Sequence, residues 1–344
     1  MTQGSDIEME QQPAKREATD TNPAQRRDSL WGYVNRYSLV IALVAVILIF
    51  SILRPESFPT TQNAGSILTG SAPLVLMALG LILPLIVNQF DLSAGFMATF
   101  AGLLAVGFIV NNGWPWYLAV IIPLLVALVI GAMMGYLIAY GGLSSLIVTL
   151  GAGSVLFGFA QLYSKNTTIF MRRADLFQAL GQERLFDLIP MPFIYVTVVA
   201  LAVWYLLEYR ATGRRLYAIG GSVEGARLVG VPVERLTVLV FVCSAFLSAL
   251  GGVVQAARVG SANPTGISSL LLPAFTAAFL GATSIRPGQY NVWGTVLAVY
   301  LVASATTGMI MLGAPASVSD IFNGAILLVA VGLAKLTARR TKSV

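Results

Sequence analysis

The chain has 344 residues, of which 57% are hydrophobic and only 10% are charged, too few charges to cover the surface of a soluble protein. It has no histidine, which excludes histidine-based metal sites, proton relays and serine–histidine–aspartate catalysis, and its single cysteine, Cys243, excludes an intrachain disulfide. The net charge of +6 suits basic loops that face an anionic membrane leaflet and gives no argument for a nucleic-acid partner.

The apolar residues fall in runs of roughly 16–25, long enough for helices to cross the ~30 Å hydrocarbon core of a bilayer. We therefore predict an all-α, polytopic membrane protein. Residues 1–37 are polar, and we expect a disordered cytoplasmic tail there. No small-residue cleavage pattern follows the first apolar run, so we expect that span to be retained. Ten transmembrane helices are predicted, at about residues 38–53, 71–87, 92–110, 116–140, 143–163, 191–207, 237–256, 269–284, 291–312 and 319–335.

Basic residues concentrate in three regions that ten spans place on one side of the membrane. Because basic loops favour the cytoplasmic side, we predict both termini in the cytoplasm, with a transmembrane domain over residues 38–336 and a basic tail over residues 337–344. The same count places the loop 208–236 in the cytoplasm and the loop 164–190 outside. The basic residues are Arg16, Arg26, Arg27, Arg36, Arg210, Arg214, Arg215, Arg227, Arg235, Lys335, Arg339, Arg340 and Lys342.

Glycine recurs inside the predicted spans, as at Gly131, Gly135, Gly151, Gly153 and Gly158. Small residues at such spacings let helix backbones approach closely. We expect tight packing in a helical bundle, which a transporter or channel needs and a receptor tethered by one span does not.

Asp91 stands at the edge of a long uncharged stretch, in the sequence Asn88-Gln89-Phe90-Asp91-Leu92-Ser93-Ala94-Gly95. A buried carboxylate is costly and is normally paired or hydrogen-bonded. One interpretation is a cap at the start of a broken or re-entrant helix. The other is a polar lining of a translocation path or gate, formed by Asn88, Gln89, Phe90, Asp91 and Ser93. The two are compatible, because broken helices in membranes usually line a cavity.

The segment Glu208–Arg235 is a charged, glycine-punctuated island between two apolar runs. Ser222 is a good N-cap, Glu224 lies in the first turn, and Gly230 is placed to end a helix. We predict a short helix over Val223–Val229, isolated in a cytoplasmic loop. It either rests on membrane lipid or serves as a docking knob for another protein; its lack of a large apolar face favours docking.

No sequence of the form G-x-x-x-x-G-K-[ST] occurs, so the chain carries no phosphate-cradling loop of that type. We expect no catalytic, cofactor or metal site, and no enzymatic activity of its own. If transport uses ATP, another polypeptide hydrolyses it.

Four sequence blocks resemble the permease subunits of bacterial ABC importers for ribose, xylose, arabinose, galactose and related sugars. The resemblance extends over nearly all of the chain beyond the N-terminal tail. Each block is moderately specific, and their order and spacing are highly specific. The blocks are Ser71–Gly80, Asp91–Gly95, Gly213–Gly221 with Ala226, Arg227 and Gly230, and Leu280–Ser284 followed by Gly294, Thr295 and Asn323–Val331.

The resemblance implies a permease of the bacterial cytoplasmic (inner) membrane that works as a homodimer. A separate ATPase with tandem nucleotide-binding domains would dock on the cytoplasmic coupling helix, and an extracytoplasmic sugar-binding protein would deliver the sugar. Carried over residue by residue, the coupling contact falls on Gly221, Ser222, Glu224, Ala226, Arg227 and Gly230.

The chain also departs from the family pattern, which commonly has two glycines and isoleucine where Asn88, Gln89 and Phe90 stand. A related polyol is therefore an alternative to a common sugar. A secondary transporter driven by an ion gradient is the alternative mechanism. Such a transporter usually needs several intramembrane groups that bind the ion, and Asp91 is a single candidate. A membrane enzyme is disfavoured by the absent histidine and the scarce buried acids.

Overall fold

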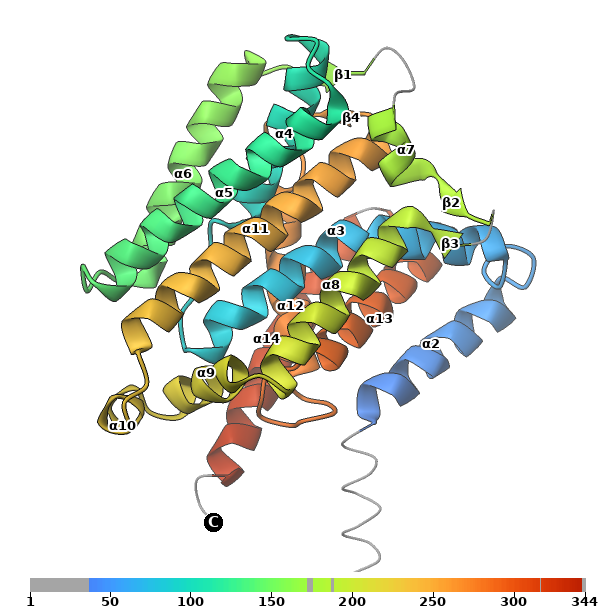
Figure 1. Cartoon of the computed structure of the whole chain (residues 1–344). Helices are drawn as coiled ribbons and strands as arrows, with labels where there is room; N and C mark the ends of the chain where they lie inside the picture. The colour runs from blue at the N-terminus through green and yellow to red at the C-terminus, as the bar shows by residue number, and fades with distance from the viewer. Residues whose placement is uncertain (1–36, 172–175, 187–188, 316, 342–344) are drawn as a thin grey trace, which may run out of the picture. The chain divides into compact units, whose positions relative to one another are not determined.

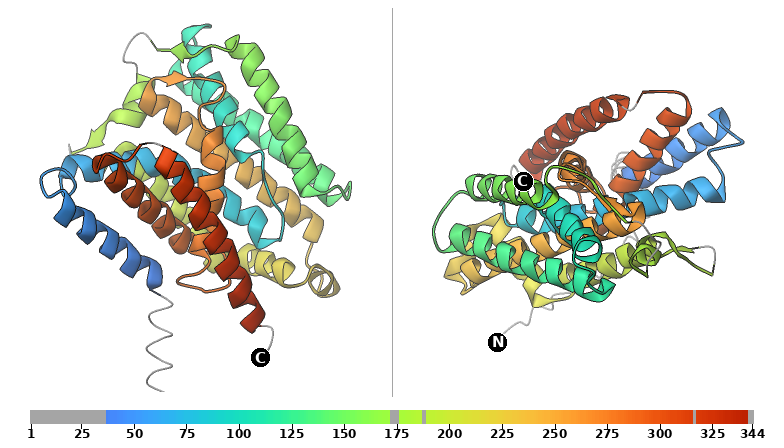
Figure 2. Two further views of the ribbon diagram at one scale, coloured as in Figure 1. Left: turned by 180° about the vertical axis from the view of Figure 1, so that it is seen from behind. Right: turned by 90° about the horizontal axis from the view of Figure 1, so that it is seen from above.

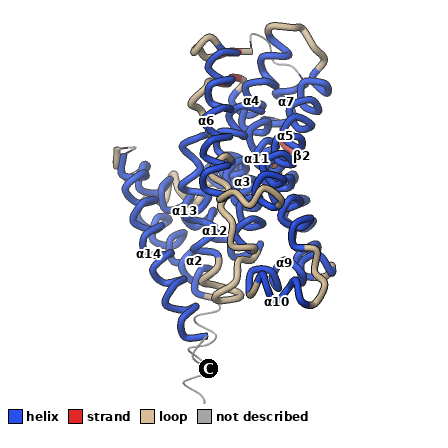
Figure 3. Tube along the Cα trace, turned by 90° about the vertical axis from the view of Figure 1, so that its left-hand side faces the viewer, coloured by secondary structure: helices blue, strands red, loops and turns tan. Residues whose placement is uncertain are grey.

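The computed structural model describes residues 37–171, 176–186, 189–315 and 317–341 (Figure 1). The predicted tail 1–37 lies outside these ranges except for Tyr37, as do the last three residues of the predicted basic tail. Among the described residues, helix predominates and each strand has two residues (Figure 3). The prediction of an all-α protein is confirmed.

The ten predicted spans each coincide with an apolar helix. Six helices are long and apolar enough to cross a membrane, namely α3, α5, α6, α8, α11 and α13, and shorter apolar helices accompany them in the described part of the chain. The helices are α2 (Ser38–Leu53), α3 (Thr61–Ile86), α4 (Ala94–Val110), α5 (Trp116–Ala139), α6 (Ser145–Ser164), α7 (Leu176–Gln182), α8 (Met191–Glu208), α9 (Ala211–Gly221), α10 (Val223–Leu228), α11 (Val233–Val259), the 3-10 turn η1 (Ser268–Leu270), α12 (Leu271–Gly281), α13 (Val292–Met311) and α14 (Ser317–Thr341).

Two predicted boundaries are wrong for physical reasons. Helix α3 begins at Thr61, ten residues before the predicted span, because the polar residues there form a helical turn capped by Thr60, whose hydroxyl accepts from the N–H of Asn63 at 3.2 Å. The predicted span 269–284 is instead α12, whose 11 residues extend about 16 Å and cross only half of a bilayer core. Gly260, at φ 69°, ends α11, and Pro264 lies in the non-helical stretch that follows.

Helices α3–α6 and α11–α14 form two halves with matching packing. In the first half, α4 packs on α5 and α6; in the second, α12 packs on α13 and α14 (Figure 2). Across the halves, α11 packs on α3, α4 and α5, while α3 packs on α11, α12 and α13. The end of α3 and the start of α11 both adjoin the α9–α10 region, so these two helices run in opposite directions (Figure 1). The halves therefore resemble an inverted repeat of the kind found in transporters.

Glycines allow α11 to approach its neighbours closely. Gly131 is one of the positions where the sequence predicts close packing, and Gly252 is not. A Cβ on Gly131 of α5 would lie 2.8 Å from the carbonyl oxygen of Phe241, and a Cβ on Gly252 would overlap the backbone of Ala98 in α4. Added Cβ atoms on Gly151 and Gly158, by contrast, would meet nothing within 4 Å, so the prediction of close packing is wrong at these two positions.

The described parts of the predicted outer loop 164–190 pack on the end of α11. Helix α7 packs on α11, and the Gln182 side-chain amide donates to the Arg258 carbonyl oxygen at 2.9 Å. Strand β1 (Ile169–Phe170) pairs antiparallel with β4 (Ser261–Ala262), and β2 (Arg184–Leu185) pairs with β3 (Ile189–Pro190). The β1–β4 pair also anchors the stretch between α11 and α12.

Candidate functional site

The break between α3 and α4 begins with a defined helix terminus. Asn88 has φ 57°, a left-handed conformation that asparagine tolerates better than most residues. Its N–H donates to the Leu85 carbonyl oxygen at 3.1 Å, and the N–H of Gln89 donates to that of Pro84 at 2.9 Å. This pair of bonds is a Schellman motif and satisfies the last carbonyls of α3. Asn88 and Gln89, predicted as path residues, therefore lie at the end of a helix.

Asp91 is fully buried, and each of its carboxylate oxygens has its own hydrogen-bond partner. Oδ1 accepts from the backbone N–H of Ser93 at 3.0 Å and from the Ser93 hydroxyl at 2.5 Å, while Oδ2 accepts from the Ser244 hydroxyl at 2.6 Å. The bonds to Ser93 order the turn that leads into α4, and the bond to Ser244 ties this turn to α11. Ser244 lies 153 positions away in sequence, which is why sequence reasoning missed it.

Hydroxyls of α6 accept hydrogen bonds from two further backbone N–H groups of the break. The Ser145 hydroxyl accepts from the N–H of Phe90 at 3.2 Å, and the Thr149 hydroxyl accepts from the N–H of Leu92 at 3.0 Å. Both residues are buried, in an environment where an unpaired N–H would be costly. The ring of Phe90 lies beside that of Phe275 in α12, with centroids 6.3 Å apart.

The starts of α4 and α12 meet inside the bundle. A Cβ on Gly95, in the first turn of α4, would lie 3.0 Å from the carbonyl oxygen of Ser268, where η1 leads into α12. The Thr99 hydroxyl accepts from the N–H of Ile267 at 3.2 Å, which fixes the stretch before η1 against α4. Helix N-termini that meet at a break carry unsatisfied N–H groups and positive partial charge, the arrangement from which transporter sites are built. We call this contact of Gly95 with Ser268 the α4–α12 junction.

A cavity of about 110 Å³ adjoins the α4–α12 junction. Its polar lining comes from Thr99, Gln255, Ser261 and Asn263, and its other walls include three glycines. No charged side chain belongs to its described lining, so its chemistry suits a neutral solute that exchanges hydrogen bonds. Sequence reasoning did not identify these four polar residues as a site, because they are brought together only by the packing of α4 on the end of α11 and the stretch after it.

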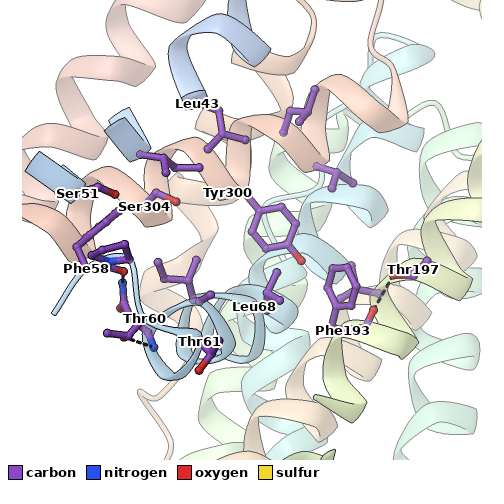
Figure 4. Close-up of a pocket in the computed structure, with 18 of the residues that line it drawn as sticks. Leu43, Ser51, Phe58, Thr60, Thr61, Leu68, Phe193, Thr197, Tyr300 and Ser304 are labelled. Carbon is purple, nitrogen blue, oxygen red and sulfur yellow. Dashed lines mark hydrogen bonds between the residues drawn. The ribbon is translucent and has the colours of Figure 1, made fainter. Parts of the chain in front are cut away.

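A larger cavity, of about 780 Å³, lies between α2, α3, α8 and α13 and has a different character. Its walls are mostly hydrocarbon (Figure 4). The hydroxyl of Tyr300 points into it between Leu68 and Phe193 and has no hydrogen-bond partner among the described residues. Such walls match hydrocarbon and not a sugar, which needs many hydrogen-bonding groups.

The predicted helix Val223–Val229 in the Glu208–Arg235 island exists as α10, which starts at the predicted residue and ends one residue earlier, at Leu228. The Ser222 hydroxyl accepts from the N–H of Gly225 at 3.1 Å, which caps the start. Gly230 has φ 78°, and the N–H of Val231 donates to the Ala226 carbonyl oxygen at 3.0 Å. These are the features of a Schellman termination, so the caps at Ser222 and Gly230 are confirmed.

The surface of α10 is almost entirely exposed, apart from Ala226. Arg227 forms an ion pair with Glu234 of α11 at 2.6 Å, while Glu224 lies exposed in the first turn. The side chains of Leu228 and Val229 are 89% and 77% exposed, which makes an apolar tip that sequence reasoning did not single out. Exposed apolar side chains on a rigid knob are typical of a contact surface.

The prediction that this helix is isolated is wrong, because a second helix, α9, directly precedes it (Figure 3). Helix α9 packs on α8, α10 and the end of α3, and it buries Leu216 and Ile219. Its Gly220 carbonyl oxygen accepts from the Asn88 side-chain amide at 2.7 Å. The predicted path residue Asn88 is therefore bonded to α9 one residue before the predicted coupling residues begin at Gly221.

Residues 63–331 match a protein family whose description reads "Branched-chain amino acid transport system / permease component". The match covers more than half of the chain. The chain belongs to this permease family. No solved structure matches the permease.

Several curated relatives of this permease are sugar permeases. The permease is 32% identical over 298 residues to the ribose import permease protein RbsC of Escherichia coli (strain K12), covering 85% of this chain and 91% of that protein. It is 27% identical over 364 residues to the xylose transport system permease protein XylH of the same strain, with coverage of 89% and 93%. It is 28% identical over 305 residues to the D-allose transport system permease protein AlsC, again covering 89% and 93%.

These findings confirm the resemblance to permeases of monosaccharide ABC importers. The permease is a multi-pass inner-membrane protein, and its relatives are transport components and not enzymes themselves. Membership of this family implies an ATPase and a substrate-binding protein as partners. The family description names amino acids, whereas these relatives are named for ribose and xylose.

Proposed function

We propose that this permease carries a monosaccharide or a related polyol across the cytoplasmic membrane by alternating access, driven by a separate ATPase that docks on α10. The observation that carries the proposal is α10 itself. It is a short helix capped at both ends, with an exposed apolar tip, in a permease that has no phosphate-cradling loop of its own. Such a helix is suited to receive force from a partner as a rigid body.

The proposed docking surface combines shape with charge. Ser222 and Gly230 fix the two ends of α10, and Ala226 anchors it inward. Glu224 and Arg227 present opposite charges, while Leu228 and Val229 supply the apolar contact that desolvated interfaces favour. The family-derived part of this surface comprises Gly221, Ser222, Glu224, Ala226, Arg227 and Gly230.

The proposed path passes the α4–α12 junction. Its uncharged polar cavity, with Gln255 and Asn263 in the lining, matches the hydroxyl groups of a sugar or polyol. Rearrangement of the break that contains Asn88, Gln89, Phe90, Asp91 and Ser93 would open and close access to it. Because these residues are held by hydrogen bonds from three other elements, their movement would be coupled to α6, α9 and α11.

The proposed assembly contains two copies of this permease, an ATPase with tandem nucleotide-binding domains and an extracytoplasmic binding protein that delivers the sugar. Both termini and the loop 208–236 lie in the cytoplasm in this arrangement, and the loop 164–190 lies outside. The weak cargo contacts expected of an uncharged cavity leave most of the specificity to the binding protein.

Uptake measurements in proteoliposomes test the function. The permease is reconstituted with its ATPase and binding protein, and uptake of radiolabelled ribose, xylose and allose is followed. We expect uptake of at least one of them that requires internal ATP and persists when an ionophore collapses the proton gradient. Uptake that continues without ATP and stops with the ionophore would instead identify a secondary transporter.

Replacement of both Glu224 and Arg227 by alanine tests the docking surface. We expect weaker retention of the ATPase in a pull-down and reduced uptake, because two charge-assisted contacts are removed. Unchanged retention together with unchanged uptake would count against docking at α10.

A further inference from the structure

Helix α9 is bonded to two segments that flank the short helices α4 and α12. On one side, the Asn88 side-chain amide, in the segment before α4, donates to the Gly220 carbonyl oxygen at 2.7 Å. On the other side, the Tyr217 hydroxyl donates at 2.7 Å to the carbonyl oxygen of Tyr290, in the loop that follows α12. Just before α9 in the chain, Glu208 at the end of α8 forms an ion pair with Arg286 of the same loop.

Close packing prevents α9 from sliding freely between these attachments. Leu216 and Ile219 are buried in the same apolar core as Ile86, the last residue of α3. A Cβ on Gly220 would overlap the Ile86 carbonyl oxygen, so glycine is what allows the end of α9 to lie against the end of α3. A displacement of α9 must therefore also displace these contacts.

Helix α10 is joined to α9 through a single residue whose hydrogen bonds belong to both helices. The N–H of Ser222 donates to the Ala218 carbonyl oxygen of α9 at 3.1 Å, and its hydroxyl accepts from the N–H of Gly225 in α10 at 3.1 Å. The two helices thus form one bonded unit, with α10 exposed and α9 partly buried.

The Tyr217 hydroxyl remains a hydrogen-bond donor at physiological pH. Burial raises the pKa of Tyr217 to about 12, with a lowering effect from Arg286 and a raising effect from Glu208. The proton that bonds to the Tyr290 carbonyl oxygen is therefore retained throughout the range in which the permease works.

We propose that Asn88 and Tyr217 are positioning residues that transmit the movement of α10 to the two short helices. The Asn88–Gly220 bond acts on α4, and the Tyr217–Tyr290 bond acts on α12. Because α4 and α12 meet at Gly95 and Ser268, both attachments converge on the α4–α12 junction. This inference rests on the proposed docking of the ATPase on α10.

Two variants remove the attachments with little other change. Asn88→Gly keeps the left-handed conformation, which glycine adopts without strain, and deletes only the amide bond to α9. Tyr217→Phe deletes only the hydroxyl. The matched controls are Asn166→Gly, at another left-handed asparagine with φ 58°, and Tyr136→Phe, whose side chain is 61% exposed on α5.

The measurement is sugar uptake per ATP hydrolysed, in proteoliposomes that hold the permease, its ATPase and the binding protein. The sugar is whichever of ribose, xylose and allose the wild-type system takes up. We expect each test variant to lower this ratio by about threefold to tenfold, the effect of losing one hydrogen bond on a coupling equilibrium. Retention of the ATPase in a pull-down and the thermal unfolding midpoint should match the wild type, and both controls should keep the wild-type ratio.

A wild-type ratio in both test variants would overturn the inference. A matching loss of ATPase retention would also overturn it, because the residues would then act in docking or folding. So would an equal fall in the controls. If Asn88→Gly does not fold, Tyr217→Phe decides alone. Failure of the proposed function is distinguishable, since it appears in the wild-type protein as absent ATPase retention or as uptake without ATP.

Discussion

Asp91 illustrates how a single carboxylate can be accommodated inside an apolar bundle. The side chain is fully buried and accepts three hydrogen bonds, two from Ser93 and one from Ser244. A buried donor left unpaired by the loss of such a bond costs about 1–3 kcal/mol. Asp91 therefore matters for the position of α4 whether or not it lines the path.

Substitution of Asp91 separates its hydrogen bonds from its charge. Asp91→Ala leaves the hydroxyls of Ser93 and Ser244 without their acceptor, and we expect a loss of about 2–3 kcal/mol, seen as a lower thermal unfolding midpoint in detergent. Asp91→Asn keeps a carbonyl for Ser93 and an amide that can donate to Ser244, so its loss should be smaller.

Uptake by the Asp91→Asn variant tests whether the charge of Asp91 is needed for transport. Normal uptake would leave Asp91 with a hydrogen-bonding role only. Strongly reduced uptake at near-normal stability would show that the charge itself is needed in transport, in line with the second interpretation of this residue.

At the scale of a single element, α10 forms because its caps are local. Ser222 reaches an N–H three residues on, and Gly230 closes the end through its own left-handed backbone. Neither bond depends on distant parts of the chain, so the sequence predicts both. The exposed tip at Leu228 and Val229 is not local in this sense, because exposure depends on what the rest of the bundle leaves uncovered.

The apolar tip of α10 gives a second test of docking. Leu228→Asp places a charge where the ATPase would bury an apolar side chain, and we expect at least a tenfold loss of ATPase affinity in a pull-down titration. Leu185→Asp, at an exposed leucine in strand β2, is the matched control and should retain wild-type affinity. Equal affinity in both variants would contradict a contact at Leu228.

The crossing of α4 and α11 depends on a close approach at Gly252. In an open helix, replacing glycine by alanine gains up to about 1 kcal/mol. At Gly252 the added Cβ overlaps the Ala98 backbone, and overpacking of this kind costs about 1–3 kcal/mol or more. Overlap with backbone cannot be relieved by a side-chain rotation, so the free-energy cost of overpacking exceeds the gain in helix propensity.

The resulting pair of variants has opposite expected signs. Gly252→Ala should lower the thermal midpoint, whereas Gly151→Ala, where the new Cβ meets nothing within 4 Å, should leave it unchanged or raise it slightly. The midpoints are measured in the same detergent by tryptophan fluorescence. A stable Gly252→Ala protein would mean that the two helices separate easily.

At the scale of the whole molecule, the short helices α4 and α12 occupy corresponding positions in the two inverted halves. Each follows a long helix, α3 or α11, and a non-helical stretch, and the two starts meet at Gly95 and Ser268. A backbone that leaves the helical state within a membrane needs hydrogen-bond partners from the protein. Thr99, Ser145 and Thr149 provide them, so the breaks are stable only in the assembled bundle.

Cysteine labelling tests the predicted topology. Phe186 and Leu228 are each 89% exposed, and of the six long apolar helices only α8 separates them in sequence, so they should lie on opposite sides of the membrane. In a variant whose native Cys243 is replaced by alanine, Phe186→Cys should react with an impermeant maleimide in intact cells. Leu228→Cys should react only in inverted vesicles. Labelling of both from one side would refute the orientation.

The sequence alone determined the membrane class, the location of the ten apolar helices and the caps of α10. These properties depend on composition or on contacts within about four residues, which can be read directly along the chain. The four sequence blocks also indicated the family, which the comparisons confirmed.

Only the tertiary structure decided that α12 is half a span, that α9 supports α10, and that Asn88 and Asp91 bond to α9 and α11. An apolar run has the same composition whether it is helical throughout or broken. The state depends on whether distant hydroxyls and amides satisfy the freed backbone. The partner of Asn88 is 132 positions away and that of Asp91 is 153 positions away, so no local pattern encodes either bond.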